Sequence, residues 1–219
     1  MSVERSLSTP HGPGRLVTDA AADPMATLLL SHGAGNGIET RDLDALAATL
    51  PAQGVSVVRL EQPWRVAGRR IATRPATLDD ALLAAVEALA DDGLPLVVGG
   101  RSAGARSAAR CAVAAGAAGC LALAFPLHPP GRPERSRLPE LLGAGVPTLL
   151  VQGERDPMGR PEEFPELMDG VEMCVVPGAD HGLAVPARGA VSEAEAMEIV
   201  VESALEWLVR EASGNGSRS

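Results

Sequence analysis

A serine lies between two glycines in the sequence Gly-Arg-Ser-Ala-Gly over residues 100–104, after the apolar run 94–99 and before an alanine-rich stretch. A strand, a tight turn and a helix in this order form a nucleophile elbow, which presents a serine hydroxyl above a sheet. Gly100 and Gly104 leave the turn room to close. The N-terminus of the following helix favours negative charge that develops on a substrate oxygen. The pattern therefore predicts that Ser102 attacks a carbonyl group.

A serine hydroxyl needs a base that removes its proton and an acid that orients the base. In folds with this elbow the order along the chain is serine, acid, histidine. His181 follows the last strand-like run and is the predicted base. Asp156 follows the preceding run and is the predicted acid, with Glu154 and Asp180 as alternatives. His32 is expected to serve the structure instead, by hydrogen bonding to the main chain.

A second glycine-rich turn follows the apolar start of the segment Leu-Leu-Leu-Ser-His-Gly-Ala-Gly-Asn-Gly, residues 28–37. The alternative, a phosphate-binding loop, requires the pattern G-x-x-x-x-G-K-[ST] or G-x-G-x-x-G, and this turn has neither. An oxyanion hole takes one N–H from the residue after the nucleophile and one from such a loop. We predict the N–H groups of Ala103 and Ala34, with Gly33 or Gly35 as alternatives to Ala34.

Three further side chains are candidates for the substrate pocket. Trp64 lies in the irregular segment 61–77, and His128 lies in the proline-rich segment 126–139. Both segments follow strand-like runs, and open α/β sheets bind ligands beyond the carboxyl ends of their strands. Arg101 fills the variable position of the elbow, where it could bind an anionic substrate group. Solvation or ion pairing is the alternative for this arginine.

Apolar runs alternate with stretches of helical periodicity along the chain. The predicted strands are 26–30, 55–60, 94–99, 120–125, 148–151 and 171–176. The predicted helices are 40–50, 78–90, 103–115, 138–142, 161–168 and 192–211. Runs without polar alternation suit strands covered on both faces, with the helices as crossovers. The expectation is an α/β fold with a mainly parallel, doubly wound sheet and no lid domain, formed by residues 1–212 as a single domain before a disordered tail, 213–219.

Bulk composition restricts the class of protein. A chain of 219 residues with 46% hydrophobic residues fits one globular domain, and its net charge of −9 argues against general affinity for nucleic acid or anionic membranes. Cys111, Cys120 and Cys174 have no C-x-x-C spacing, so no disulfide framework, metal site or cofactor is predicted. Without a signal peptide or a membrane span, the expected location is cytoplasmic. The segment around His11 is expected to be a mobile N-terminus.

These motifs together resemble the α/β-hydrolase superfamily over nearly the whole chain: Gly-Gly-Arg-Ser-Ala-Gly, Ser-His-Gly-Ala-Gly, Gln-Gly-Glu-Arg-Asp-Pro and Ala-Asp-His. With the later Phe-Pro-Leu-His-Pro-Pro-Gly, the elbow is similar to a small lidless branch near the dienelactone hydrolases, which includes a testis-expressed protein and a chromatin-complex subunit. The resemblance implies Ser102 as nucleophile, Asp156 as acid, His181 as base, and Ala34 and Ala103 as oxyanion donors. Dienelactone hydrolases themselves use cysteine where this chain has Ser102.

The sequence thus predicts a serine hydrolase that cleaves a small acyl ester or thioester through an acyl-enzyme intermediate. Its expected partner is a small acyl substrate at an exposed, shallow site. A binding or scaffold protein with a vestigial site is the alternative suggested by the chromatin-subunit relatives. A peptidase or an acyltransferase on the same residues is a third interpretation.

Overall fold

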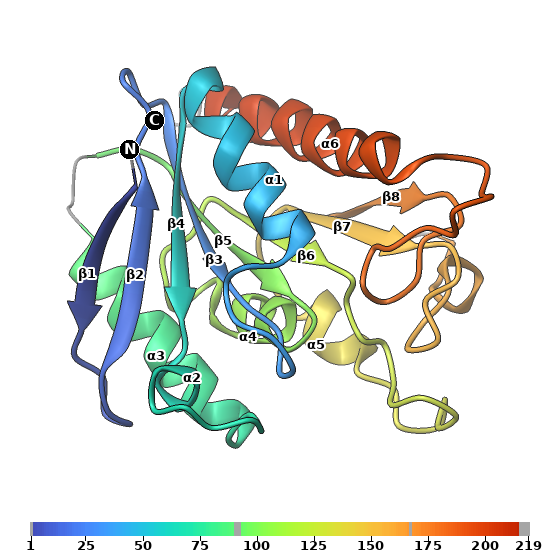
Figure 1. The fold of residues 1–219 in the computed structure, drawn as a ribbon, viewed down its shortest axis with the longest axis horizontal. Coiled ribbons are helices and arrows are strands. Elements are labelled where there is room, and N and C mark those ends of the chain that lie inside the picture. The colour runs from blue at the N-terminus through green and yellow to red at the C-terminus, as the bar shows by residue number, and fades with distance from the viewer. Residues whose placement is uncertain (1, 90–92, 167, 215–219) are drawn as a thin grey trace.

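The computed structural model describes residues 2–89, 93–166 and 168–214, and within them eight strands form one sheet in the order β1-β2-β4-β3-β5-β6-β7-β8 (Figure 1). The strands are β1 (Val3–Leu7), β2 (Gly14–Asp19), β3 (Ala26–Ser31), β4 (Val55–Glu61), β5 (Leu96–Arg101), β6 (Gly119–Leu123), β7 (Thr148–Gly153) and β8 (Val171–Val176). The α-helices are α1 (Arg41–Thr49), α2 (Pro63–Val66), α3 (Pro75–Ala88), α4 (Ala103–Cys111), α5 (Leu138–Leu142) and α6 (Glu193–Gly214). Two 3₁₀ helices are η1 (Leu50–Gln53) and η2 (Pro161–Glu163).

Strands β3 to β8 pair in parallel, whereas β1 and β2 pair antiparallel at one edge. This arrangement confirms the predicted mainly parallel α/β sheet. The predicted helix 161–168 is wrong beyond Glu163, because Phe164 is extended (ψ 151°), as expected of a residue that precedes a proline. Position 167 of that prediction, and position 90 at the predicted end of the helix 78–90, lie outside the described residues.

The N-terminal segment departs from the sequence prediction, because it forms the antiparallel hairpin β1–β2 at the sheet edge. His11 lies in the turn between the two strands, where its Nε2 is 2.7 Å from a carboxylate oxygen of Asp80. In β1 the four residues before Leu7 are exposed, and Leu7 is buried. An edge strand with so little apolar surface gives no continuous apolar run, which is the signal used to find the other strands.

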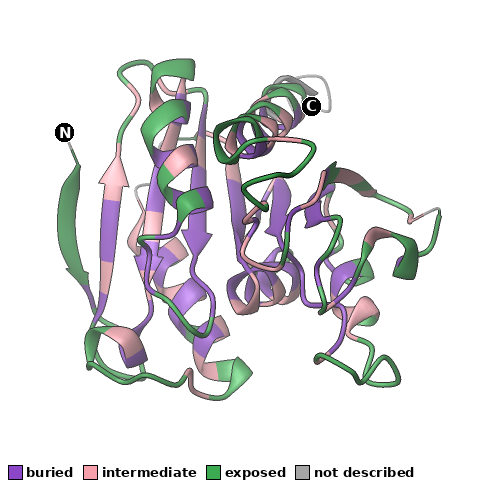
Figure 2. Cartoon of the chain, turned by 45° about the vertical axis from the view of Figure 1, so that its right-hand side comes forward, coloured by how far each residue is buried: buried purple, intermediate pink, exposed green. Residues whose placement is uncertain are grey.

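Helices cover both faces of the sheet, with α1 and α6 on one side and α3, α4 and α5 on the other (Figure 1). Neighbouring residues of β3 point to opposite faces: Leu28 packs with α1 and α6, and Leu29 packs with α3 and α4. Burial is concentrated in the central strands, and β1 at the edge is exposed (Figure 2). The doubly covered sheet explains why its central strands are apolar on both sides.

The last helix, α6, closes the face that it shares with α1. Its Trp207 ring lies against Gly119 of β6, where an added Cβ would come within 2.7 Å of the indole. The helix continues to Gly214, two residues into the segment predicted to be disordered, and the rest of that segment, 215–219, lies outside the described residues. No helix in the described ranges is long and apolar enough to cross a membrane.

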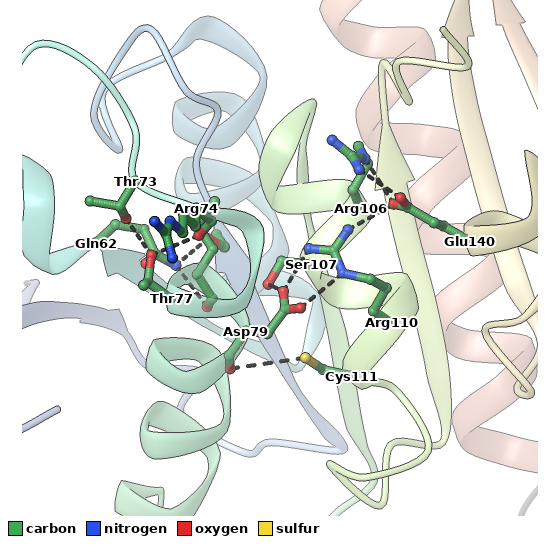
Figure 3. A network of polar contacts seen from close by, with 12 residues as sticks. Gln62, Thr73, Arg74, Thr77, Asp79, Arg106, Ser107, Arg110, Cys111 and Glu140 are labelled. Carbon is green, nitrogen blue, oxygen red and sulfur yellow. Dashed lines mark hydrogen bonds and ion pairs between the residues drawn. The ribbon is translucent and has the colours of Figure 1, made fainter. Parts of the chain in front are cut away.

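A network of charged side chains joins α4 to the neighbouring helices α3 and α5 (Figure 3). Asp79 of α3 accepts hydrogen bonds from Ser107 and, in bidentate geometry, from Arg110 of α4. Arg110 also donates to Glu140 of α5 at 2.7 Å, and Arg106 donates to both oxygens of the same carboxylate. Bidentate arginine–carboxylate pairs restrict orientation as well as distance. The network therefore fixes α4, the helix that follows the predicted elbow.

Candidate active site

The predicted elbow is formed where β5 ends at Arg101 and α4 begins at Ala103. Between them Ser102 has φ 54° and ψ −111°, a backbone conformation that side-chain-bearing residues rarely adopt. Its N–H donates a 2.9 Å hydrogen bond to the carbonyl of Leu123 at the end of β6. Strain of this kind persists only where surrounding packing enforces it, and it clusters at functional sites.

Both elbow glycines are required by close approach of main chain to main chain. A Cβ on Gly104 would lie 2.1 Å from the carbonyl oxygen of Ser31, and a Cβ on Gly100 would lie 2.3 Å from the same atom. Neither position allows a side chain without moving β3 or the elbow. The elbow is therefore seated directly on the carboxyl end of β3, where the second glycine-rich turn begins.

Three side chains from distant segments are brought into one hydrogen-bonded series. The Oγ of Ser102 is 2.8 Å from Nε2 of His181, and Nδ1 of the same ring is 2.8 Å from Oδ2 of Asp156. Asp156 is fully buried, whereas His181 and Ser102 are partly exposed. Because a carboxylate accepts the Nδ1 proton, the lone pair of Nε2 faces the serine hydroxyl. This arrangement can remove the Ser102 proton and leaves the hydroxyl within reach of a solute.

Asp156 is held by two further donors. The amide nitrogen of Gln152 donates to Oδ2 at 3.0 Å, and the N–H of Met158 donates to Oδ1 at 2.8 Å. Gln152 also donates to the carbonyl of Gly159 at 2.7 Å, so it ties together both ends of the turn after β7. Sequence reasoning missed this role, although a glutamine that ends an apolar strand run is a signal that could have suggested it.

The two alternatives for the acid lie elsewhere. Glu154 accepts a hydrogen bond from the N–H of Gly178. Asp180 accepts the N–H groups of Gly182 and Ala184 through one oxygen, and thereby shapes the loop that carries the histidine. Neither carboxylate makes the hydrogen bond to the imidazole that Asp156 makes.

His32 organises the turn between β3 and α1, as the sequence predicts. Its Nε2 accepts the main-chain N–H of Gln62 at 3.0 Å, and its Nδ1 is 2.7 Å from the carbonyl oxygen of Gly33. The first contact requires a lone pair on Nε2 and the second requires a proton on Nδ1, so the imidazole is neutral. Burial lowers the pKa of His32 to about 4, which agrees with this assignment.

The same contact sets the direction of one peptide unit beside the elbow. A Cβ on Gly33 would lie 3.4 Å from Cβ of Ser102, so the turn borders Ser102. Because the Gly33 carbonyl points to the His32 ring, the N–H of Ala34 in the same trans peptide points away from it. Ala34 is exposed, and Ala103 occupies the first position of α4, where an N–H has no acceptor within the helix.

Trp64 and His128, predicted as pocket side chains, are both almost fully buried in the structure. The Trp64 ring is 3% exposed and stands edge-on to His32 with centroids 5.4 Å apart. It lines a separate cavity of about 250 Å³ with Arg69, Thr73 and other residues, none of which belongs to the Ser102 series. His128 is 5% exposed, and both of its ring nitrogens contact acceptors.

Arg101, the third pocket candidate, points into the protein. Its side chain is 10% exposed, its Nη2 donates a 2.9 Å hydrogen bond to the carbonyl of His181, and its Nε lies 3.2 Å from a carboxylate oxygen of Asp42. The ion-paired alternative therefore describes this side chain in the structure. The structure thus places Ser102, Asp156 and His181 together and gives the three pocket candidates other surroundings.

The sequence and the fold of the chain were compared with known proteins. A family profile described as an alpha/beta hydrolase domain matches residues 24–209, and no curated protein matches the chain. Among solved structures, an alpha-beta serine hydrolase homologue from Coxiella burnetii shares 18% identity with a TM-score of 0.73, over 92% of this chain and 96% of the other.

Two further solved structures are similar over most of their length. A serine hydrolase without a lid from Xanthomonas campestris is 19% identical, with a TM-score of 0.71 and 94% of both chains covered. A dienelactone hydrolase from Anabaena variabilis is 18% identical, with a TM-score of 0.73 over 96% of this chain and 97% of the other. At these identities the likeness shows the fold.

Proposed function

Since the chain belongs to the alpha/beta hydrolase domain family, we propose that it is a serine hydrolase that cleaves a small acyl ester or thioester through an acyl-enzyme intermediate. The observation that carries the proposal is the pair of 2.8 Å contacts that run from Ser102 through His181 to Asp156. This series supplies a nucleophile, a base and a group that fixes the base in one tautomer.

In the first half-reaction the Oγ of Ser102 attacks the carbonyl carbon while its proton passes to Nε2 of His181. The tetrahedral intermediate collapses, and the imidazolium returns that proton to the departing alcohol or thiol. In the second half-reaction His181 takes a proton from water, whose oxygen attacks the acyl carbon. Collapse of this intermediate breaks the bond to Ser102, releases the carboxylic acid and restores the serine hydroxyl.

Each tetrahedral intermediate carries a negative oxygen, for which we propose the N–H groups of Ala103 and Ala34 as donors. Support for Ala103 is its position at the start of α4, where the helix dipole also favours an anion. Support for Ala34 is the His32 contact, which points the Ala34 N–H away from the imidazole, in a turn where a Cβ on Gly33 would lie 3.4 Å from Cβ of Ser102. One such donor is worth on the order of 10²–10³ in kcat in serine hydrolases.

The decisive experiment combines turnover with covalent labelling. We expect wild-type protein to hydrolyse a short-chain nitrophenyl ester or a short acyl thioester and to be labelled by a fluorophosphonate at Ser102, located by mass spectrometry. The Ser102→Ala variant should lose both activities and keep its melting temperature. A matched control is Ser203→Ala on α6, which removes a hydroxyl bonded within that helix and should leave turnover unchanged.

Two outcomes would contradict the proposal. Undiminished turnover by purified Ser102→Ala would exclude this serine as the nucleophile. A wild-type protein that reacts with none of these substrates or probes but retains a stable partner in pull-down experiments would favour the scaffold alternative.

A further inference from the structure

Arg101 contacts three segments whose relative positions the proposed reaction depends on. Its Nη2 donates a hydrogen bond to the carbonyl of His181, and its Nε pairs with Asp42 in the first turn of α1. A Cβ on Gly33 would lie 3.6 Å from its Nη1, so the guanidinium also borders the turn after β3. One buried side chain thus touches the base loop, the start of α1 and the proposed oxyanion turn.

The partner of Arg101 is buried more deeply than the arginine itself. Asp42 is fully buried, and within the described residues neither of its carboxylate oxygens has a hydrogen-bond donor. The Arg101 guanidinium is the charged group paired with it. A buried carboxylate without compensation is strongly unfavourable, as is a buried guanidinium without a counter-charge. Each group therefore holds the other in place, and neither is available to a substrate.

Hydrogen bonds between Asp180 and residues 182–184 close the loop around His181. The hydrogen bonds of Asp180 fix the residues on either side, and Leu183 has a positive φ of 52°. The carbonyl of His181 itself is held by Arg101, which is bonded through one peptide unit to Ser102. The elbow therefore carries both the nucleophile and the anchor of its base. A change of about 1 Å between such groups can lower a rate by about 10²-fold.

We propose that Arg101 and Asp42 form a positioning pair that holds the His181 loop against the elbow. In this role Arg101 acts through His181 and makes no contact with substrate, so its loss should reduce the chemical step and leave substrate binding intact. The proposal rests on the proposed serine hydrolase function, because it assigns a task within that reaction.

The test must separate positioning from stability. Replacing both members of a buried ion pair with apolar residues is often neutral for stability, whereas removing one member is not. The informative variant is therefore Arg101→Met/Asp42→Leu, with Arg101→Met, Arg101→Lys and Asp42→Asn beside it. A matched control is Arg59→Met/Asp19→Leu, which removes a partly buried arginine–carboxylate pair between β4 and β2 that makes no contact with His181.

For the double variant Arg101→Met/Asp42→Leu we expect a cooperative thermal transition, a kcat for the nitrophenyl ester lowered by about 10- to 100-fold, and a KM within about twofold of wild type. The rate of fluorophosphonate labelling at Ser102 should fall in parallel. Arg101→Lys, which keeps the charge but not the two-pronged guanidinium, should retain a kcat between those of wild type and Arg101→Met. The control pair should leave kcat within about twofold.

The failures of the two proposals are distinguishable. Wild-type protein that neither turns over the ester nor labels at Ser102 would overturn both. Active wild type together with a folded double variant of equal kcat would overturn the positioning pair alone. A loss confined to KM would also overturn it, since that result would make Arg101 a substrate contact.

Discussion

The Nε2 atom of His128 lies 2.8 Å from a carboxylate oxygen of Glu163, and its Nδ1 lies 3.0 Å from the carbonyl oxygen of Pro129. Both neighbours are acceptors, so the ring satisfies both contacts only when both nitrogens carry protons. The pKa of His128 is accordingly raised, first by the hydrogen bond to Pro129 and then by Glu163 against the effect of burial. The main-chain N–H of His128 donates to the carbonyl of Met158, which connects His128 to the turn that orients Asp156.

This pair predicts a pH window for part of the stability. The folded pKa of His128 lies above its ordinary 6.5, so its contribution is complete below about pH 6.5 and is lost as pH rises through the folded value. The pKa of Glu163 is lowered from 4.5, chiefly by the main-chain N–H of Arg160, so its contribution is lost as pH falls below about 4.5. The difference in melting temperature between wild type and His128→Gln should be largest between these limits. A difference independent of pH would contradict the charged pair.

Replacement of His32 by phenylalanine should damage the turn beside the elbow. The variant leaves the buried N–H of Gln62 without its acceptor, at a cost of about 1–3 kcal/mol, and frees the Gly33 carbonyl to rotate. We expect a lower melting temperature and a kcat reduced by about 10-fold or more, as the Ala34 donor loses its direction. His11→Gln, at the β1–β2 turn, is the control and should leave kcat unchanged. Normal kcat in a folded His32→Phe protein would contradict the proposed turn geometry.

The neutral state of His32 makes stability depend on pH in the direction opposite to that expected for His128. Because its folded pKa is about 4 and its ordinary value is 6.5, the unfolded chain binds the extra proton between these values. Stability should therefore decrease as pH falls from about 6.5 to about 4. Comparing wild type with His32→Phe over this range isolates the effect, and equal slopes for the two proteins would refute it.

Asp156→Asn should impair the chemical step far more than the fold. An asparagine at this position presents an N–H to the imidazole and favours the wrong tautomer, so we expect kcat to fall by about 10³- to 10⁴-fold. The control is Asp180→Asn, whose remaining amide oxygen can still accept from Gly182 and Ala184. Steady-state kinetics of both variants measure the contrast, and a loss in Asp180→Asn as large as in Asp156→Asn would argue against Asp156 as the acid.

Alanine at Gly104 should destabilise the protein by about 2 kcal/mol or more, because its Cβ would lie 2.1 Å from a main-chain oxygen that cannot move independently of β3. Gly35→Ala is the matched control, since a Cβ there meets no atom within 4 Å. Chemical denaturation of the two variants gives the comparison. Equal stability would show that the elbow is not seated as tightly on β3 as the structure indicates.

The three cysteines should differ in reactivity. Burial raises the pKa of both Cys111 and Cys120 to about 12, with Asp79 adding to the effect at Cys111, whereas Cys174 is partly exposed. Thiolate is the reactive form, so iodoacetamide should modify Cys174 first in the native protein. Mass-spectrometric mapping before and after denaturation tests this order. Preferential modification of Cys120 in the native state would contradict the buried position.

The sequence contained enough to find the three residues that the structure joins in one hydrogen-bonded series. The strands and elbow could be located from apolar runs and glycine spacing, and the parallel topology then requires Ser102, Asp156 and His181 to lie at one edge of the sheet. The direction in which a side chain points could not be predicted from the sequence in the same way. Arg101 and His128 look like pocket residues from their positions, but their surroundings depend on partners from other segments.

The surroundings of these two side chains could not be predicted because their partners are distant in the sequence. Asp42 and Glu163 meet Arg101 and His128 only after the chain has folded, and neither carboxylate has a local spacing that marks it. The hairpin β1–β2 was missed for a related reason, because a polar edge strand is defined by its neighbour in the sheet more than by its own composition.

The packing of α6 on β6 also has a consequence for folding during synthesis of the chain. Ser102, Asp156 and His181 all precede α6, but the sheet face behind them is covered by Trp207 and the residues around it. A nascent chain that ends before α6 would contain all three of these residues and still expose an apolar surface to water. We therefore expect the proposed catalytic groups to be synthesised before the protein can fold completely, so this intermediate is the stage at which chaperones would matter most.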